Sequence, residues 1–559
     1  MKMFPSGPTS IIAGIYDDLR IGDIIDGLVD WDREKSHLSP GLRTKAMIIN
    51  MFCGRKPLYR LHEAYEYLDT ENLFGAGVYP EDLKDYSMVR ALDKISKADA
   101  RKVFSSIAMQ VITEGNIPIK TLHADTTSIS VEGIFETDDE YADFQINHGH
   151  SKNHRPDLKQ FKYGLGVTKD KIPVMGNSFS GNVDDKTWNY DFIKEMRNQF
   201  DPQTLKDMIY IADSALITKS NLEAIARISQ QKDTPQLRFI SRLPGTFSKE
   251  NELIEKAFEK DEWEYFGTFS EKKDAAVYKG QEFVSKLYQE TYKFIVVHSS
   301  KLDGRKQRGL NTRLDKKEKE LEKEAKKLEK DSFACQPDAL LAWEKFQKEH
   351  GDKHFQLEAS INQEVKRGPG RPSKKQKEDP EYIYRIEISV KRDKEAIEQT
   401  QQRLSCFILI TNIMEGHTAY ELLKEYKEQF NVETAFKFLK SPIFVGGIYL
   451  KKPERVEALS YVFLIALLIF YILERRVRKA MEKEEEPLII PGKVETFKPT
   501  GVKILQSFEF MMVHTTEDPK KRAFPANLKV PERLLRLAGL TPEVYLRVLP
   551  PPNKFPEKN

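Results

Sequence analysis

Strand-like runs recur through the middle of this 559-residue chain and limit the class of fold that it can adopt. Ile119–Val131 alternates apolar and polar residues, which is the pattern of a strand with one buried face. Met208–Ala212 is a continuously apolar run, as expected of a strand buried on both faces. Further strand-like runs are Tyr163–Thr168, Ile172–Phe179, Leu237–Leu243 and Leu404–Thr411, and Trp188–Gln199 has helical character. The pattern predicts a mixed α/β domain built around one sheet.

Composition excludes several other classes of protein. Hydrophobic residues make up 40% and charged residues 31%, a balance that excludes a wholly disordered chain and a multi-span membrane protein. The longest uncharged apolar run, Ala458–Leu473, falls short of the roughly 20 residues that a bilayer helix needs, so we expect a buried core helix. Cys53, Cys335 and Cys406 are too few and too far apart for a disulfide framework or a Cys-rich zinc site. Without a signal-peptide pattern, we expect a cytoplasmic protein.

Changes in the residue pattern along the chain divide it into five segments. We expect a helical N-terminal region at 1–115, a sheet domain split between 116–245 and 404–480, an insertion at 246–403 and a C-terminal region at 481–559. The net charge of +3 predicts no particular partner, so any nucleic-acid surface must come from local charge patterning.

The N-terminal region has a helical pattern from Gly41 to Gln110. An apolar stripe is formed by Leu58, Leu61, Tyr65 and Leu68. Asp85–Ser87 supplies capping residues ahead of a short helix, with Arg90 and Lys94 on its outer side. Two interpretations remain open for this region: a structural cap, or a helix-turn-helix whose second helix offers Arg90 and Lys94 to DNA.

The expected insertion contains leucines that recur every seven residues. Leu314, Leu321 and Leu328 lie in a run dense in Lys and Glu, and they span only two heptads. This length favours a solvated surface helix or helical hairpin over an intermolecular coiled coil.

A basic segment, Lys366–Lys377, follows within the insertion. It has six positive and no negative charges and is too rich in Gly and Pro to form a helix or a strand. Its Arg367 and Arg371 lie in a context that resembles the Gly-Arg-Pro core of an AT-hook, in which an extended Arg enters a narrow A·T minor groove. The alternative is a flexible basic loop, and both interpretations place positive charge near DNA.

Three acidic residues stand out by their positions. Asp125 lies in the first strand among small residues, and Asp213 directly follows the Met208–Ala212 run, at the strand end where an α/β sheet presents ligand-binding groups. Glu433 lies in a helical stretch, Tyr426–Lys440. Each alone is also explained as a turn or helix cap. Together they could converge, and gathered carboxylates select a hard divalent cation such as Mg²⁺ or Mn²⁺.

The spacing of Tyr426, Gln429, Glu433 and Lys440 resembles the Tyr-x2-Arg-x3-Glu-x6-Lys signature of bacterial DDE transposases of the IS-four-like group. The resemblance extends over most of the chain and looks closest to the long branch of that group. It implies an RNase H-like catalytic domain with a large insertion, in which Asp125, Asp213 and Glu433 bind two Mg²⁺ ions, with Mn²⁺ as a substitute. Tyr426 and Lys440 would hold the DNA backbone. Gln429 departs from the signature Arg, so a phosphate contact is weakened or moved here.

The resemblance further implies an endonuclease that cuts double-stranded DNA at the ends of an insertion sequence and joins them to target DNA. We expect a homodimer in the active complex, a location at the nucleoid and no membrane association. Two alternatives are an RNase H-like nuclease without strand transfer and an inactive DNA-binding relative. The sequence contains no P-loop, Rossmann glycine pattern or GxSxG motif, so ATP is not implied. His148, His150 and His154 lie in a polar context without a nearby Cys, which favours a loop over a zinc site.

Overall fold

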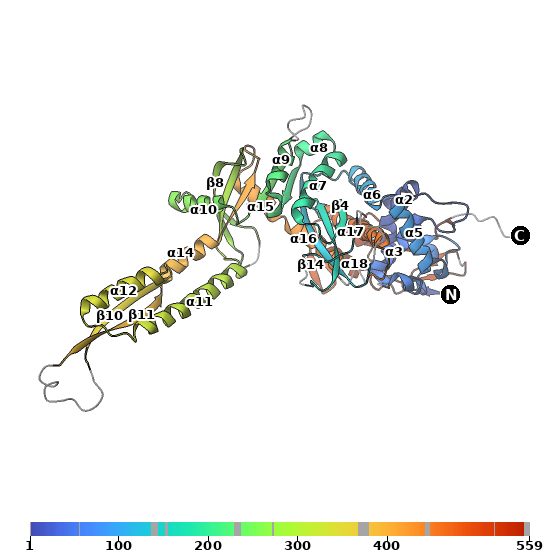
Figure 1. The fold of residues 1–559 in the computed structure, drawn as a ribbon. Helices are drawn as coiled ribbons and strands as arrows, with labels where there is room; N and C mark the ends of the chain where they lie inside the picture. Colours follow the sequence, from blue (N-terminus) through green and yellow to red (C-terminus); the bar gives the residue numbers. More distant parts are fainter. Residues whose placement is uncertain are drawn as a thin grey trace. The chain divides into compact units, whose positions relative to one another are not determined.

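The structure is a computed structural model that describes residues 2–54, 56–135, 144–150, 155–227, 236–270, 273–366, 380–441, 448–518 and 520–552. The chain divides into two compact units. Unit 1 contains residues 1–241, 411–413 and 422–559, and unit 2 contains residues 242–410 and 414–421. Figure 1 labels many of the elements of both units.

The sheet of unit 1 has the strand order expected of an RNase H-like fold. Its strands are β2 (Thr121–Val131), β3 (Lys159–Val167), β4 (Pro173–Ser180), β5 (Ile209–Ala212) and β6 (Arg238–Arg242). They lie in the order β4-β3-β2-β5-β6. Strand β3 is antiparallel to both of its neighbours, β2 and β4, and β5 and β6 run parallel to β2. The mixed α/β class is confirmed, and each strand overlaps a run that the sequence predicts.

One face of this sheet is covered by α7 (Asp185–Gln199), which extends the predicted helix by three residues at its start. The Trp188 indole lies over Gly164 of β3, where a Cβ atom would lie 2.0 Å from Nε1. Trp188 Nε1 donates to Asn177 Oδ1 at 2.8 Å, and the ring packs against Phe192, with 4.6 Å between the ring centroids. Gly164 is therefore required by the close approach of the helix.

The other face is covered at β3 and β4 by α17 (Pro453–Met481), which forms the centre of unit 1, with α6 (Ala100–Glu114) beside it on β4. The helix is longer than the apolar run Ala458–Leu473, and it is long and apolar enough to cross a membrane by composition. However, 94% of its most apolar window is buried within the protein, which agrees with the predicted core helix. Glu474, the first charged residue after the run, is buried within the helix, and its carboxylate pairs with Lys171 at 2.7 Å and with Arg478 at 3.0 Å.

The N-terminal helices belong to the same compact unit as the sheet, and the first, third, fifth and sixth of them pack on α17. They are α1 (Thr9–Asp18), α2 (Ile21–Leu28), α3 (Pro40–Ile49), α4 (Thr70–Phe74), α5 (Asp85–Lys97) and α6 (Ala100–Glu114). The predicted α-helix through Leu58 is wrong in type: Leu58–Tyr65 is a 3-10 segment interrupted at Arg60, where φ is −119°. Leu61 and Tyr65 are nevertheless buried as the stripe predicts.

The C-terminal region returns to the N-terminal helices. Its elements are β13 (Leu488–Ile490), β14 (Val494–Thr496), α18 (Gly501–Gln506), β15 (Val513–Thr515), β16 (Arg522–Ala523), α19 (Glu532–Leu537) and α20 (Glu543–Leu546). β15 pairs with β1 (Met3–Phe4). Arg522 is buried and forms ion pairs with Asp69 and, at 2.9 Å, with Glu71. These contacts fix the last hundred residues against the first hundred.

Unit 2 contains a meander of strands and a separate helix-covered hairpin. The meander is formed by β7 (Glu264–Thr268), β8 (Val277–Leu287) and β9 (Glu290–Ser299), with β12 (Cys406–Thr411) beside β9. α10 (Ser248–Lys260) packs on β9. The hairpin joins β10 (Phe355–Val365) to β11 (Tyr382–Arg392) and is accompanied by α11 (Gly304–Leu328), α12 (Gln336–His350) and α14 (Lys394–Leu404) (Figure 1).

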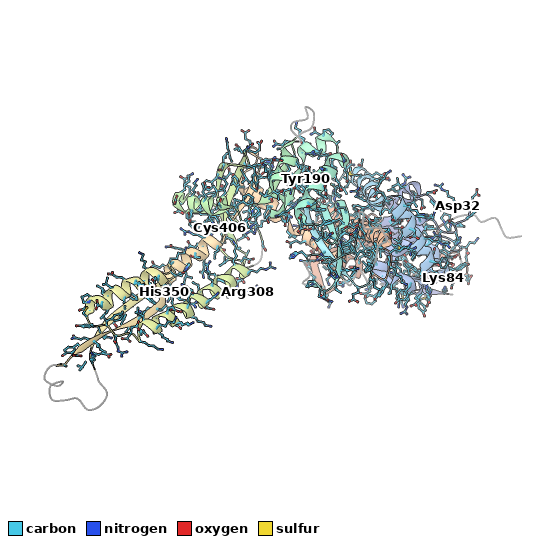
Figure 2. The ribbon with its side chains drawn as sticks, viewed as in Figure 1. Asp32, Lys84, Tyr190, Arg308, His350 and Cys406 are labelled. Carbon is cyan, nitrogen blue, oxygen red and sulfur yellow. The ribbon has the colours of Figure 1, made fainter. Side chains whose placement is uncertain are left out.

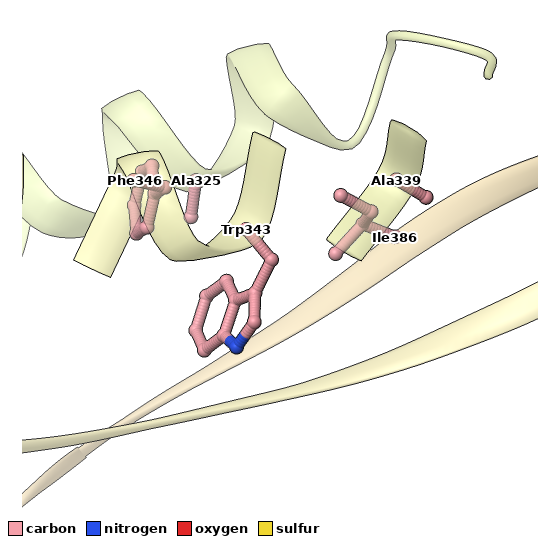
Figure 3. Packing of buried hydrophobic residues seen from close by; sticks show 5 residues of the cluster. All are labelled: Ala325, Ala339, Trp343, Phe346 and Ile386. Atoms are coloured by element: carbon pink, nitrogen blue, oxygen red, sulfur yellow. The ribbon is translucent and has the colours of Figure 1, made fainter. Parts of the chain in front are cut away.

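The hairpin module has its own small core (Figure 3). Trp343 and Phe346 of α12 pack with Ala325 of α11 and Ile386 of β11. A second cluster contains Leu310, Leu314, Leu321 and Phe355. The leucine repeat therefore packs inside the chain, in agreement with the surface-helix interpretation. The strands β10 and β11 were not anticipated from the sequence.

Candidate active site

The two aspartates predicted as metal ligands lie side by side at the carboxyl ends of parallel strands. The last paired residues of β2 and β5 are Ala124 and Ala212, so Asp125 and Asp213 follow at the same level of the sheet. Neighbouring strands lie about 4.8 Å apart. His123 pairs with Ile211, and because side chains alternate along a strand, Asp125 and Asp213 project from the same sheet face as these residues.

Each aspartate already makes a local hydrogen bond. Asp125 Oδ1 accepts from the Thr126 N–H at 2.7 Å, and Asp213 Oδ1 accepts from the Ala215 N–H at 3.0 Å. Asp213 thus caps the short 3-10 segment Ser214–Leu216, which is the alternative role that the sequence left open. Capping engages one carboxylate oxygen, so it is compatible with a second role for the other.

The charges of both aspartates affect the buried phenol of Tyr210. Burial raises the pKa of Tyr210 well above its usual value, and the charges of Asp213 and Asp125 raise it further. Tyr210 projects from the opposite sheet face, where its hydroxyl donates to Asn189 Oδ1 at 2.8 Å.

The helical stretch that carries Glu433 is broken in two. The predicted continuous helix Tyr426–Lys440 is wrong here: α15 (Ala419–Lys427) ends before Glu428, and α16 (Phe430–Lys440) begins after Gln429. The break is tightened by hydrogen bonds from Gln429 N to Tyr426 O and from Asn431 N to Glu428 O. Tyr426 therefore lies on α15, whereas Glu433 and Lys440 lie on α16.

Helix α16 packs on β2 and β3, the strands that contain and neighbour Asp125. Its buried side is formed by Val432, Ala435, Phe436 and Leu439. Glu433, Lys437 and Lys440 are exposed. Within the described ranges, no three His, Cys, Asp or Glu side chains gather closely enough to hold a metal ion. The structure thus brings Asp125 and Asp213 together and places Glu433 on the adjoining helix, and the three-ligand set stays a prediction.

Gln429 connects the helix to the aspartate strand, a contact that the sequence analysis missed. Its Nε2 atom donates to the Ala124 carbonyl at 3.0 Å, one residue before Asp125. Its amide also acts on the buried His123 ring. Burial lowers the pKa of His123 to about 4, the Lys169 charge lowers it as well, and the Gln429 amide opposes the shift. To anticipate that Gln429 is half-buried, one would first have to predict the break between α15 and α16.

The remaining predicted DNA contacts lie elsewhere. Arg90 of α5 is exposed, with its guanidinium 5.7 Å from the centre of the Tyr86 ring. Lys94 Nζ donates to the Asp30 carbonyl at 2.7 Å. Arg367 and Arg371 lie outside the described residues, as does His154. His148 and His150 are exposed.

Comparison with known proteins gives little beyond this geometry. A family model described as a domain of unknown function, DUF4277, matches residues 8–109. No curated protein matches the chain. A cryo-EM structure of a piggyBac transposase synaptic complex with hairpin DNA is similar over 90% of this chain and 70% of that chain, with 9% identical residues and a TM-score of 0.34. Likeness at this level does not establish a function, which must be argued from the strand order and the carboxylates.

Proposed function

We propose that the chain is a DDE-type transposase that uses Asp125, Asp213 and Glu433 for metal-dependent phosphoryl transfer on DNA. The observation that carries the proposal is the position of two aspartates at one level of adjacent parallel strands, in a sheet of RNase H-like order. A helix that packs on the first of these strands carries the third carboxylate.

The donor set fits Mg²⁺ or Mn²⁺, because both prefer carboxylate oxygens. Asp125, Asp213 and Glu433 would hold the cations. Two such ions activate the attacking oxygen and stabilise the leaving oxygen of an in-line transfer when bound. Lys440, exposed at the end of α16, would hold a DNA phosphate beside them.

The proposal is tested with the carboxylates one at a time. The substrate is a labelled duplex taken from the DNA that flanks the coding region, incubated with Mg²⁺ and a target plasmid. Asp125→Asn, Asp213→Asn and Glu433→Gln should each abolish cleavage and joining while leaving binding of the duplex within about twofold. The matched control is Glu428→Gln, which removes one carboxylate from the same helix break and should retain activity.

Three outcomes separate the alternatives. Cleaved and joined products support a transposase, and cleavage without joining selects a nuclease. Binding without cleavage at any Mg²⁺ or Mn²⁺ concentration selects an inactive DNA-binding relative. Near-normal cleavage by one of the three variants would remove that residue from the site.

A further inference from the structure

The outer surface of α11 has an unusual distribution of charge. The helix contains ten basic and five acidic residues. Leu310, Leu314 and Leu321 face the core of the hairpin module. On a helix of 3.6 residues per turn, the opposite side carries a row of basic residues. We call this row the outer stripe; it is formed by Arg305, Arg308, Lys316, Lys319, Lys323 and Lys326.

All six residues of the outer stripe are exposed, and Figure 2 shows Arg308 near the beginning of the helix. In the part of the chain that the structure describes, none of the six side chains has an ion-pair partner. Helical periodicity places no acidic residue on this central line. The gaps between the basic residues are occupied by neutral residues, Gly309 and Thr312. A Cβ atom added at Gly309 would meet nothing within 4 Å, so this glycine leaves the backbone open to a partner.

The acidic residues of α11 lie on its flanks and are mostly paired within the module. Asp315 and Glu318 both pair with Arg392 of β11, each at 2.6 Å. Glu320 pairs with Lys317 at 3.3 Å, and Glu324 with Lys327 at 2.7 Å. These ion pairs neutralise the flanks, so that the net positive charge of the helix is concentrated on the outer stripe.

The geometry points to the phosphate backbone of double-stranded DNA as the ligand of the outer stripe; the inference rests on the proposed function and names a second place where DNA is held. The stripe is straight and about 32 Å long at 1.5 Å per residue, which is close to one turn of B-DNA. Its successive charges lie on one side of the helix, which a DNA duplex can approach from solvent. Contacts of this kind give affinity and register without reading sequence.

A membrane surface fits the stripe less well. An amphipathic helix that lies in a membrane interface inserts an apolar face, and the apolar face of α11 is buried against Phe355 and the hairpin. Arginines and lysines on a rigid helix, without an accompanying apolar surface, instead match a polyanion with regularly spaced charges.

The test removes three charges from the stripe in the full-length chain. Lys316→Gln, Lys319→Gln and Lys323→Gln are combined, since Gln is nearly as good a helix former as Lys. The matched control combines Lys345→Gln, Lys348→Gln and Lys353→Gln, which removes the same charge from exposed positions elsewhere in the module. Circular dichroism checks that both variants fold. Binding to a 30-base-pair mixed-sequence duplex is measured by fluorescence anisotropy at several salt concentrations.

The stripe variant should bind at least about tenfold more weakly at low salt, and its salt slope should fall by about 2–3 units, close to 0.9 for each lost phosphate contact. The control should change the slope by less than about one unit. Equal effects of the two variants, or no effect of the stripe variant on a wild-type protein that binds the duplex, would overturn the inference and leave the proposed function standing. A wild-type protein that does not bind the duplex would overturn both.

Two further probes are titrated in parallel. Vesicles of phosphatidylserine and a single-stranded RNA of equal charge should bind the wild-type protein more weakly than the duplex. A loss confined to vesicles or to RNA in the stripe variant would assign the surface to that partner and contradict the inference.

Discussion

Gln429→Ala should loosen α16 from the aspartate strand rather than remove a phosphate contact. The wild-type amide donates one half-buried hydrogen bond, of 3.0 Å, to the Ala124 carbonyl. A bond of this kind contributes about 1 kcal/mol net. Its loss should therefore raise the population of states in which α16 is undocked by about fivefold. Gln429→Arg keeps an N–H donor at the position and should restore most of the docking.

The assay is hydrogen exchange followed by mass spectrometry. Peptides that cover Phe430–Lys440 should exchange about fivefold faster in the Ala variant, because local opening controls the exchange of protected amides. Peptides from Asp185–Gln199 are the internal reference, since α7 covers the other face of the sheet and does not contact Gln429. The same samples are titrated with duplex DNA over a range of salt concentrations.

The two roles of Gln429 give opposite results. Docking predicts faster exchange with an unchanged salt slope. A direct phosphate contact by the amide predicts unchanged exchange and weaker duplex binding in the Ala variant, with the salt slope again unchanged because the amide carries no charge. The second result would refute the assignment of Gln429 as a positioning residue.

Two stability predictions concern buried ionisable groups in unit 1. Glu474→Ala removes the carboxylate that pairs with Lys171 and Arg478 and accepts a hydrogen bond from the Gly501 N–H at 2.7 Å. This substitution should lower the free energy of unfolding in urea by about 3–5 kcal/mol. The control, Glu482→Ala on the exposed surface, should change it by less than about 0.5 kcal/mol. Burial lowers the pKa of His123 from 6.5 to about 4. As the pH falls, the unfolded chain therefore takes up a proton at this residue before the folded protein does. The protein should lose about 3 kcal/mol of stability in all between pH 6.5 and pH 4. A pH dependence unchanged in His123→Gln would contradict this.

The strands of unit 1 could be predicted from the sequence because both of their signals are local. The alternation from Ile119 and the apolar run before Asp213 depend on nearest neighbours, and β2 and β5 appear where these patterns predict them. Strands β10 and β11 were not predicted, although Leu357, Ala359 and Ile361 alternate with polar residues as in a strand. The dense charge around them resembled a surface helix region, and their apolar sides are covered by α11 and α12 from the same insertion.

The candidate site was only partly accessible to sequence reasoning. The position of Asp213 after an apolar strand indicates its place on a sheet edge, and parallel pairing with β2 then brings it to Asp125. The break at Glu428 and Gln429 depends on contacts with β2. Gln429 and Ala124, which the hydrogen bond joins, lie 305 residues apart in the sequence. No local pattern encodes such a contact.

The late position of α17 in the chain has a consequence for how the protein is made. The sheet strands β2 to β5 and the N-terminal helices leave the ribosome long before Pro453–Met481, the helix that covers them. At roughly 5–20 residues per second, the interval between the end of β4 and the start of α17 is roughly 15–50 s. During this time α6 is present to pack on β4, but the part of the sheet face that α17 covers stays exposed, and chaperones would have a window in which to bind it. Nascent chains that stop within the insertion would lack α17, so an incomplete product could not fold its first half stably.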